Sequence, residues 1–211
     1  MRLANIRTWV FDLDNTLYPA RALYDEIGER MTRYIARATG LDSDRALEIR
    51  ERYFHQYGAT VVGLMRHYGI DARDFLLDVH EADHSVLAPD PELRALIAAL
   101  PGRRIIFTNG GGGHAERVLE SLRLGDLFDQ VFDIEHARLT PKPQRACYEL
   151  LLTHCGFDAN GALLIEDTLR NLEPAYDLGF TTALVGDVHP SPLPPYVDHH
   201  ATDVKTLLRR L

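Results

Sequence analysis

The 211 residues of this chain predict an α/β fold, in which a parallel sheet carries helices on both faces. Two observations support this prediction. Short apolar segments rich in β-forming residues alternate with helical patterns over most of the chain, which is typical of parallel strands joined by helical crossovers. Between residues 19 and 85 the alternation stops and every periodic segment is helical. We therefore expect a Rossmann-like sheet with an inserted all-helical cap.

The predicted strands are short apolar runs that end in polar residues or glycine. The first, TWVFDL, ends abruptly in acids, which is typical of a buried strand whose polar end lies at a sheet edge. Four later runs have the same apolar body, and most of them precede a helical pattern. The predicted strands cover residues 8–13, 103–109, 130–134, 162–167 and 181–186.

The helices outside the insertion have recognisable boundaries. Asp90 is a predicted N-cap, Pro91 suits a first helical turn, and Gly102 closes the same pattern. Further helices are expected within residues 113–122, 143–156, 171–179 and 203–211.

The proline-containing stretch 186–200 is predicted to be an irregular surface loop. Its two adjacent histidines, His199 and His200, are interpreted as loop residues. Neighbouring side chains do not easily face one metal ion, and no ligand spacing joins them to acids.

The insertion carries its own start and stop signals. Asp42 or Ser43 and Asp71 are predicted N-caps, while Gly40 and Gly69 are predicted to end helices. Its apolar and aromatic positions recur at helical spacing and are interpreted as a core of its own. The predicted domains are an α/β core of residues 1–18 and 86–211 and a cap of residues 19–85.

The composition is that of an ordinary globular protein with an excess of acids. A net charge of −8 and a pI near 5.6 argue against general binding to nucleic acid or to an anionic membrane, because both are negatively charged. No apolar window reaches the roughly 18 residues of a membrane span, and no signal peptide is recognisable. The two cysteines are expected to be free thiols on one helix, so a cytoplasmic location is expected.

Two carboxylates close the first predicted strand. Asp12 and Asp14 lie two positions apart, so their side chains project to the same side of the strand. In an open parallel sheet, ligands bind at the edge formed by the carboxyl ends of the strands. Taken alone, such a pair is more often simply two exposed loop acids, and the later strands weaken that interpretation.

The second and third predicted strands are followed by residues suited to an anion. Thr108 and Asn109 end the second strand, and the glycines after them let the backbone approach a phosphoryl group closely. Lys142 lies between two prolines beyond the third strand. A compact ammonium group suits the neutralisation of a phosphoryl oxygen next to a nucleophile.

An acidic pair, Glu166 and Asp167, closes the fourth predicted strand. Together with Asp12 it forms a cluster of carboxylates that only Lys142 balances, and such repulsion is costly. A hard divalent cation relieves this repulsion, and oxygen ligands with open water positions suit Mg²⁺ better than zinc. Mg²⁺ is therefore the predicted cofactor.

Taken together, these segments resemble a known family. DLDNT, TN, the lysine and ED occur in the order, and on the elements, of the four motifs of the haloacid dehalogenase superfamily. The match covers nearly the whole chain, and the helical segment 19–85 is similar to the cap of one large subfamily. The resemblance implies a magnesium-dependent phosphatase that forms an aspartyl-phosphate and then hydrolyses it.

The resemblance also implies roles for the residues of the first three motifs. Asp12 would be the nucleophile and a ligand of the metal. Asp14 would be the general acid and base, and its backbone carbonyl would bind the metal. Thr108, Asn109 and Lys142 would hold the phosphoryl group.

Around the metal, Asp167 would be the third protein ligand, and Glu166 would assist through water or by orientation. Asn171 stands where many relatives carry a second acid, so its contribution to metal binding stays open.

Several other activities are weighed against hydrolysis. Dehalogenases resemble this fold but lack an acid two residues after the nucleophile, because a halide leaving group needs no proton. Asp14 therefore argues against dehalogenation, whereas a phosphomutase would retain both acids and stays open. A receiver-type switch would carry its acidic pair and its phosphorylated aspartate on different strands. An inactive relative would normally have lost one of the motif residues.

The segment FDLDNTLYP is similar to the start of a subgroup that includes pyrimidine 5′-nucleotidases. A nucleoside 5′-monophosphate is therefore the leading substrate hypothesis. Phosphoglycolate, sugar phosphates and other small phosphomonoesters stay open as alternatives. The expected partner is in each case a small phosphorylated metabolite.

Overall fold

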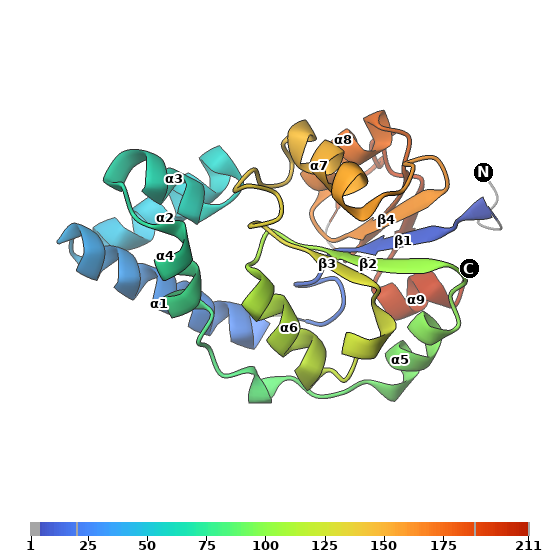
Figure 1. Ribbon diagram of the computed structural model, residues 1–211, viewed down its shortest axis with the longest axis horizontal. Helices are drawn as coiled ribbons and strands as arrows, with labels where there is room; N and C mark the ends of the chain where they lie inside the picture. The colour runs from blue at the N-terminus through green and yellow to red at the C-terminus, as the bar shows by residue number, and fades with distance from the viewer. Residues whose placement is uncertain (1–4, 20, 188, 211) are drawn as a thin grey trace.

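The computed structural model describes residues 5–19, 21–187 and 189–210. Residues 1–4 and 211, which belong to the predicted core domain, lie outside this description, as do residues 20 and 188. The described strands form one parallel sheet in the order β3-β2-β1-β4-β5-β6, which confirms the predicted α/β fold (Figure 1). The strands are β1 (Thr8–Phe11), β2 (Arg103–Phe107), β3 (Gln130–Phe132), β4 (Ala162–Glu166), β5 (Thr181–Val185) and β6 (His199–Ala201).

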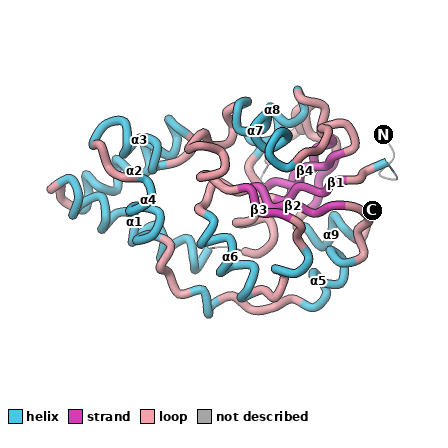
Figure 2. The backbone as a smooth tube through the Cα atoms, in the orientation of Figure 1, coloured by secondary structure: helices cyan, strands magenta, loops and turns pink. Residues whose placement is uncertain are grey.

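Helices cover both faces of the sheet (Figures 1 and 2). Side chains alternate along β1, so that Trp9 and Phe11 enter one core cluster while Val10 enters the other. One cluster is completed by α5 (Pro91–Ala98), α6 (Gly112–Ser121) and α9 (Val204–Leu208), and the other by α7 (Arg145–Cys155) and α8 (Leu172–Asp177). Strand β1 is buried on both faces and is therefore apolar throughout except for Thr8.

Between β1 and α5, four α-helices of the described chain pack around a third core cluster. In Figure 1 these helices lie beside the sheet, beyond the carboxyl end of β1. The sequence signals at their ends are confirmed, because Asp42 and Asp71 accept hydrogen bonds as N-caps and Gly69 is a left-handed C-cap. The helices are α1 (Arg21–Thr39), α2 (Ser43–Tyr57), α3 (Thr60–Tyr68) and α4 (Ala72–Val79). That residues 19–85 form a separate cap domain stays a prediction.

One part of the predicted loop 186–200 is wrong. His199 and His200 belong to the edge strand β6, which pairs with β5 through the partners Leu184 and His200. The strand is only three residues long and is half-buried, so it carries neither an apolar run nor a legible alternation. Only its pairing with β5 defines it.

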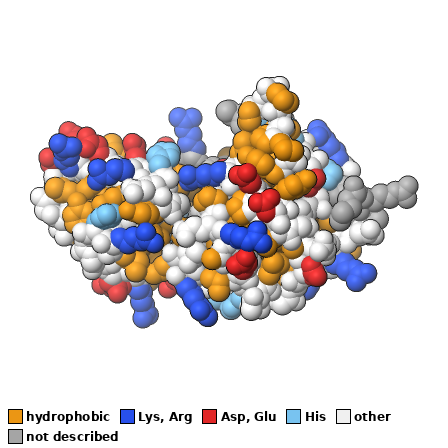
Figure 3. Space-filling model, turned by 90° about the horizontal axis from the view of Figure 1, so that it is seen from above, with side chains coloured by type: hydrophobic (Ala, Val, Ile, Leu, Met, Phe, Trp, Pro, Cys, Tyr) orange, Lys and Arg blue, Asp and Glu red, His pale blue; other side chains and the backbone are white. Residues whose placement is uncertain are grey.

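Two further features bear on the surface and the cysteines. No helix in the described ranges is long and apolar enough to cross a membrane. On the face seen in Figure 3, acidic and basic side chains are interspersed. Both cysteines, Cys147 and Cys155, are buried on α7 and are unpaired, as expected.

Candidate active site

Asp12 lies directly after β1, where the sheet ends. Its backbone N–H donates to the carbonyl of Ile165 on β4 at 2.9 Å, so the residue is still held between neighbouring strands. Its side chain is buried, and Oδ1 accepts from Nζ of Lys142 at 2.7 Å. Oδ2 accepts from the hydroxyl of Thr16 at 3.1 Å. The carboxylate is therefore fixed in position from both sides.

Lys142 joins the ends of three strands. Its Nζ donates to Oδ1 of Asp12 and to Oε2 of Glu166, each at 2.7 Å, and to the carbonyl of Phe107 at 2.9 Å. These three acceptors use every donor of an ammonium group. Burial alone would lower the pKa of Lys142, but the two carboxylates raise it above its ordinary value. The two carboxylates therefore favour the charged form of this lysine at the sheet edge.

Three carboxylates gather around this charge. Oxygen atoms of Asp12, Glu166 and Asp167 lie within 4.8 Å of one another. Burial, and then the charge of Glu166, raises the pKa of Asp12 to about 7, and burial followed by the charge of Asp12 raises that of Asp167 to about 6. One lysine therefore does not neutralise the cluster.

The donor set of this cluster fits a hard divalent cation. All three carboxylates offer oxygen, which is the ligand atom that Mg²⁺ prefers. Asn171 is 7% exposed and donates from Nδ2 to Glu166 at 3.1 Å, while its own buried Oδ1 has no hydrogen-bond partner. The buried Oδ1 of Asn171 and the carboxylates that one lysine does not neutralise are oxygen donors of the kind that suits such a cation.

Asp14 occupies a different environment, two residues further along. Its Oδ1 accepts from the hydroxyl of Tyr18 and lies 2.9 Å from Nε2 of His114, which is 1% exposed. Burial would raise the pKa of Asp14, but His114 and then Tyr18 outweigh it and hold the pKa below its usual range. The two aspartates of the first motif thus have pKa values shifted in opposite directions, because their surroundings differ.

His114 was not singled out from the sequence. It lies in the first turn of α6, directly after the run of glycines that follows β2. A histidine at the start of a helix carries no periodic signal, so its position beside the glycine run is the only clue that the sequence offers.

The side chains of Thr108 and Asn109 organise two loops. The hydroxyl of Thr108 accepts from the backbone N–H of Gly110 at 2.9 Å. Asn109 accepts from the backbone N–H of Lys142 at 2.8 Å and donates to the Lys142 carbonyl at 3.1 Å. It also donates to the carbonyl of Gly58, in the turn between α2 and α3, at 3.4 Å. Asn109 therefore links the loop that carries Lys142 to the segment formed by α1–α4.

Gly58 allows these segments to meet. Its φ of 85° is left-handed, and an added Cβ would lie 2.5 Å from the carbonyl oxygen of Lys142. Only glycine combines this conformation with so close an approach.

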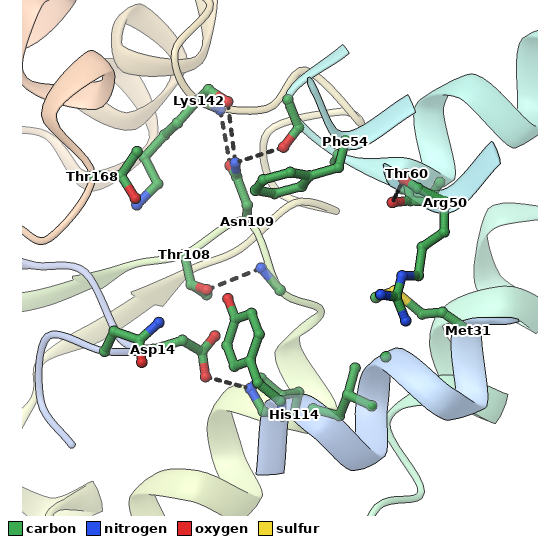
Figure 4. Close-up of a pocket in the computed structure, with 18 of the residues that line it drawn as sticks. Asp14, Met31, Arg50, Phe54, Thr60, Thr108, Asn109, His114, Lys142 and Thr168 are labelled. Atoms are coloured by element: carbon green, nitrogen blue, oxygen red, sulfur yellow. Dashed lines mark hydrogen bonds and ion pairs between the residues drawn. The ribbon is translucent and has the colours of Figure 1, made fainter. Parts of the chain in front are cut away.

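These residues border a single cavity of about 440 Å³, a size suited to a small ligand (Figure 4). From the four-helix side, the cavity is lined by Tyr24, Met31, Arg50 and Phe54. The side chain of Arg50 crosses α1 at Gly28, where an added Cβ would lie 2.7 Å from Nη1. The residues predicted from the sequence all line this cavity: Asp12, Asp14, Thr108, Asn109, Lys142, Glu166, Asp167 and Asn171.

Comparisons with known proteins give this architecture a context. A family model described as haloacid dehalogenase-like hydrolase matches residues 6–179. Phosphate metabolism protein 8 of Saccharomyces cerevisiae is 26% identical over 190 residues, which cover 82% of this chain and 59% of that protein. The chain thus spans about three fifths of the length of this curated relative.

Solved structures with the same fold include enzymes of two reaction types. A HAD phosphatase from Thermococcus onnurineus matches with a TM-score of 0.67 at 15% identity, over 97% of both chains. The L-2-haloacid dehalogenase from Xanthobacter autotrophicus, with chloropropionic acid covalently bound, matches with a TM-score of 0.63 at 18% identity, also over 97% of both chains. Likeness at these identities shows the fold and leaves the reaction to the site.

Proposed function

Because the chain belongs to the haloacid dehalogenase-like hydrolases, we propose that it is a magnesium-dependent phosphomonoester hydrolase that forms an aspartyl-phosphate on Asp12. One observation carries this choice of reaction. Asp14, with a hydrogen bond to His114, lies beside the nucleophile as a group able to exchange protons. An alkoxide leaving group needs such a proton and a halide does not, so the site favours phosphate ester cleavage over dehalogenation.

The residues divide the reaction between them. Asp12 attacks phosphorus, and the bond to the leaving oxygen breaks as the aspartyl-phosphate forms. Lys142 and Thr108 neutralise and orient the phosphoryl oxygens, since phosphoryl transfer depends mainly on positioning and charge. Asp14 gives a proton to the leaving oxygen and later takes one from the water that cleaves the intermediate.

The carboxylates of Asp12 and Asp167 would hold Mg²⁺, with Glu166 and Asn171 supporting the site and the backbone carbonyl of Asp14 as a further ligand. Support comes from the clustered oxygens and from the unpartnered Oδ1 of Asn171. When bound, the cation supplies the positive charge that the cluster lacks and that a phosphoryl group requires.

The substrate is a nucleoside 5′-monophosphate, and residues 19–85 act as a cap over it. Phe54 is 45% exposed and lines the cavity with Tyr24, so a base can stack on an aromatic ring there. Arg50 offers hydrogen-bond donors to the polar edge of the base. Phosphoglycolate and sugar phosphates are smaller substrates that would leave these rings uncovered.

A phosphate-release screen tests this proposal. The purified chain is incubated with Mg²⁺ and a panel of nucleoside monophosphates, sugar phosphates and phosphoglycolate, beside Asp12→Asn. We expect the rate of phosphate release to be at least about 10³-fold lower in Asp12→Asn than in the wild type. Faster turnover of UMP or CMP than of the other esters supports the nucleotide assignment, and equal rates for every base contradict it. Release of halide from a 2-haloacid, without release of phosphate from any ester, would replace phosphatase by dehalogenase.

A further inference from the structure

A chain of hydrogen bonds runs from a backbone carbonyl through two buried histidines to Asp14. Nδ1 of His84 lies 2.7 Å from the carbonyl oxygen of Ala82, and Nε2 of His84 lies 3.2 Å from Nδ1 of His114. Nε2 of His114 then lies 2.9 Å from Oδ1 of Asp14. His84 is 7% exposed and His114 is 1% exposed, so water does not compete for these bonds.

Counting donors shows where a hydrogen must lie. A carbonyl oxygen only accepts, so Nδ1 of His84 donates to Ala82. If His84 is neutral, its Nε2 accepts from Nδ1 of His114. A hydrogen must then also lie between Nε2 of His114 and Oδ1 of Asp14, because otherwise the lone pairs of these two atoms would face and repel each other. If His84 carries both hydrogens, Nε2 of His114 is itself the donor. Every assignment commits Oδ1 of Asp14 to this bond.

The segment that joins α4 to α5 holds His114 in this orientation. Ala82 and His84 belong to it, and the ring of His80 stacks on that of His114, with centroids 4.8 Å apart and planes at 20°. Arg117, three residues after His114 on α6, donates to the carbonyl of His80 at 2.6 Å. These contacts fix both the position and the plane of the His114 ring.

The two oxygens of Asp14 therefore differ. Tyr18 also donates to Oδ1, so that oxygen takes part in two hydrogen bonds. Oδ2 lies on the side of Gly110, where an added Cβ would be 4.0 Å from it, directly after the Thr108–Asn109 pair. We propose that His114, oriented by His84, is a positioning residue that keeps Oδ1 of Asp14 occupied and leaves Oδ2 to exchange protons with the substrate.

This inference rests on the proposed function. The proton on Oδ2 passes to the leaving oxygen while the bond from that oxygen to phosphorus breaks and the Asp12–phosphorus bond forms. A proton from the attacking water returns to Oδ2 when the aspartyl-phosphate is cleaved. His114 keeps its hydrogen bond to Oδ1 throughout and acts through Asp14.

A comparison of leaving groups tests the role of His114. For each variant, kcat/KM is measured with Mg²⁺ on p-nitrophenyl phosphate, whose leaving group departs as a stable anion, and on the best alkyl phosphate or nucleotide from the release screen. This ratio reports the steps up to the departure of the leaving group. Asp14→Asn serves as the reference for complete loss of the acid, and His154→Phe, outside the cavity, controls for the replacement of a histidine by phenylalanine.

We expect His114→Phe to lower kcat/KM on the alkyl ester by about 10²-fold, and on p-nitrophenyl phosphate by less than about tenfold. His114→Gln keeps an amide donor for Oδ1 and should recover most of the difference. His84→Leu should likewise lower kcat/KM on the alkyl ester more than His84→Gln does, because only glutamine can accept from Nδ1 of His114. His154→Phe should keep both rates.

Equal losses on both esters in His114→Phe, or no recovery in His114→Gln and His84→Gln, would overturn the positioning role. Should Asp14→Asn show no dependence on the leaving group, the acid role in the proposed function is wrong and the inference fails with it. A wild-type chain that hydrolyses neither ester contradicts the proposed function directly, which separates the two failures.

Discussion

Nζ of Lys142 lies 2.7 Å from Oδ1 of Asp12, a residue 130 positions earlier in the chain. The same nitrogen lies 2.7 Å from Oε2 of Glu166. One buried cation is therefore shared by two buried carboxylates, and a third carboxylate, that of Asp167, lies within the same cluster. This imbalance is costly for folding, and a bound cation would relieve it.

Replacing Lys142 should destabilise the protein through the loss of its charge, not through the loss of packing. Lys142→Met leaves Asp12 and Glu166 buried without their positive partner, and we expect a loss of about 3–5 kcal/mol in the free energy of unfolding. Urea denaturation measures this loss. Catalysis should also be lost, because the ammonium group proposed to neutralise a phosphoryl oxygen is removed.

The double variant Lys142→Met with Glu166→Gln is the matched control. It removes one of the two buried carboxylates that lose their positive partner, and it should recover part of the lost stability without recovering activity. A Lys142→Met protein as stable as the wild type would show that the ion pairs contribute nothing to folding.

Metal binding should depend on pH in a defined direction. The pKa of Asp12 is raised from 3.8 to about 7, so without metal the folded protein holds its proton more tightly than the unfolded chain does. This contribution to stability is complete below about pH 4 and is lost as the pH rises through about 7. Mg²⁺ needs the ionised form, so the gain in Tm at a fixed Mg²⁺ concentration should grow from pH 5 to pH 8.

Thermal denaturation with and without Mg²⁺ across this range checks the expectation. Asp12→Asn and Asp167→Asn should show a smaller gain, and Asp12→Asn should lose most of its pH dependence. A gain of equal size at pH 5 and pH 8 in the wild type would argue that protons and the cation do not compete for Asp12.

Arg50 should affect substrate affinity more than the chemical step. Its guanidinium lines the cavity, with Nη1 donating to the hydroxyl of Thr32 at 3.1 Å, away from Asp12. We expect Arg50→Gln to raise KM for the preferred nucleotide by about tenfold with little change in kcat. Arg52→Gln is the matched control, since Arg52 lies over the ring of Tyr53 and does not line the cavity. An unchanged KM would remove Arg50 from the recognition of the substrate.

His80 should make the protein sensitive to acid. Burial, and then the neighbouring His114, lowers the pKa of His80 from 6.5 to about 3. Between these pH values His80 is protonated in the unfolded chain and neutral in the folded protein, so stability is lost as the pH falls from about 6.5 toward 3. In urea denaturation, His80→Phe should flatten this loss, whereas replacement of the exposed His55 by Gln should keep the wild-type slope. If the free energy of unfolding of His80→Phe fell with pH as steeply as that of the wild type, His80 would not be the source of the acid sensitivity.

Much of the fold follows from local patterns in the sequence. The apolar runs predicted β1 to β5, and Asp42, Asp71 and Gly69 mark real helix ends because capping needs only a few adjacent residues. β6 was missed because a short edge strand next to prolines has no pattern of its own.

The motif residues could be proposed from the sequence because each follows a strand, and parallel strands direct their carboxyl ends to one edge. The roles given to these residues stay predictions. What only the tertiary structure decided is which side chains share partners. The order β2-β1-β4 brings Asp12 and Glu166 close enough for Lys142 to bond both. Packing also brings His114 onto Oδ1 of Asp14, and His84 onto His114. Hydrogen bonds between residues that are distant in the chain depend on packing geometry, which no local spacing of residues encodes.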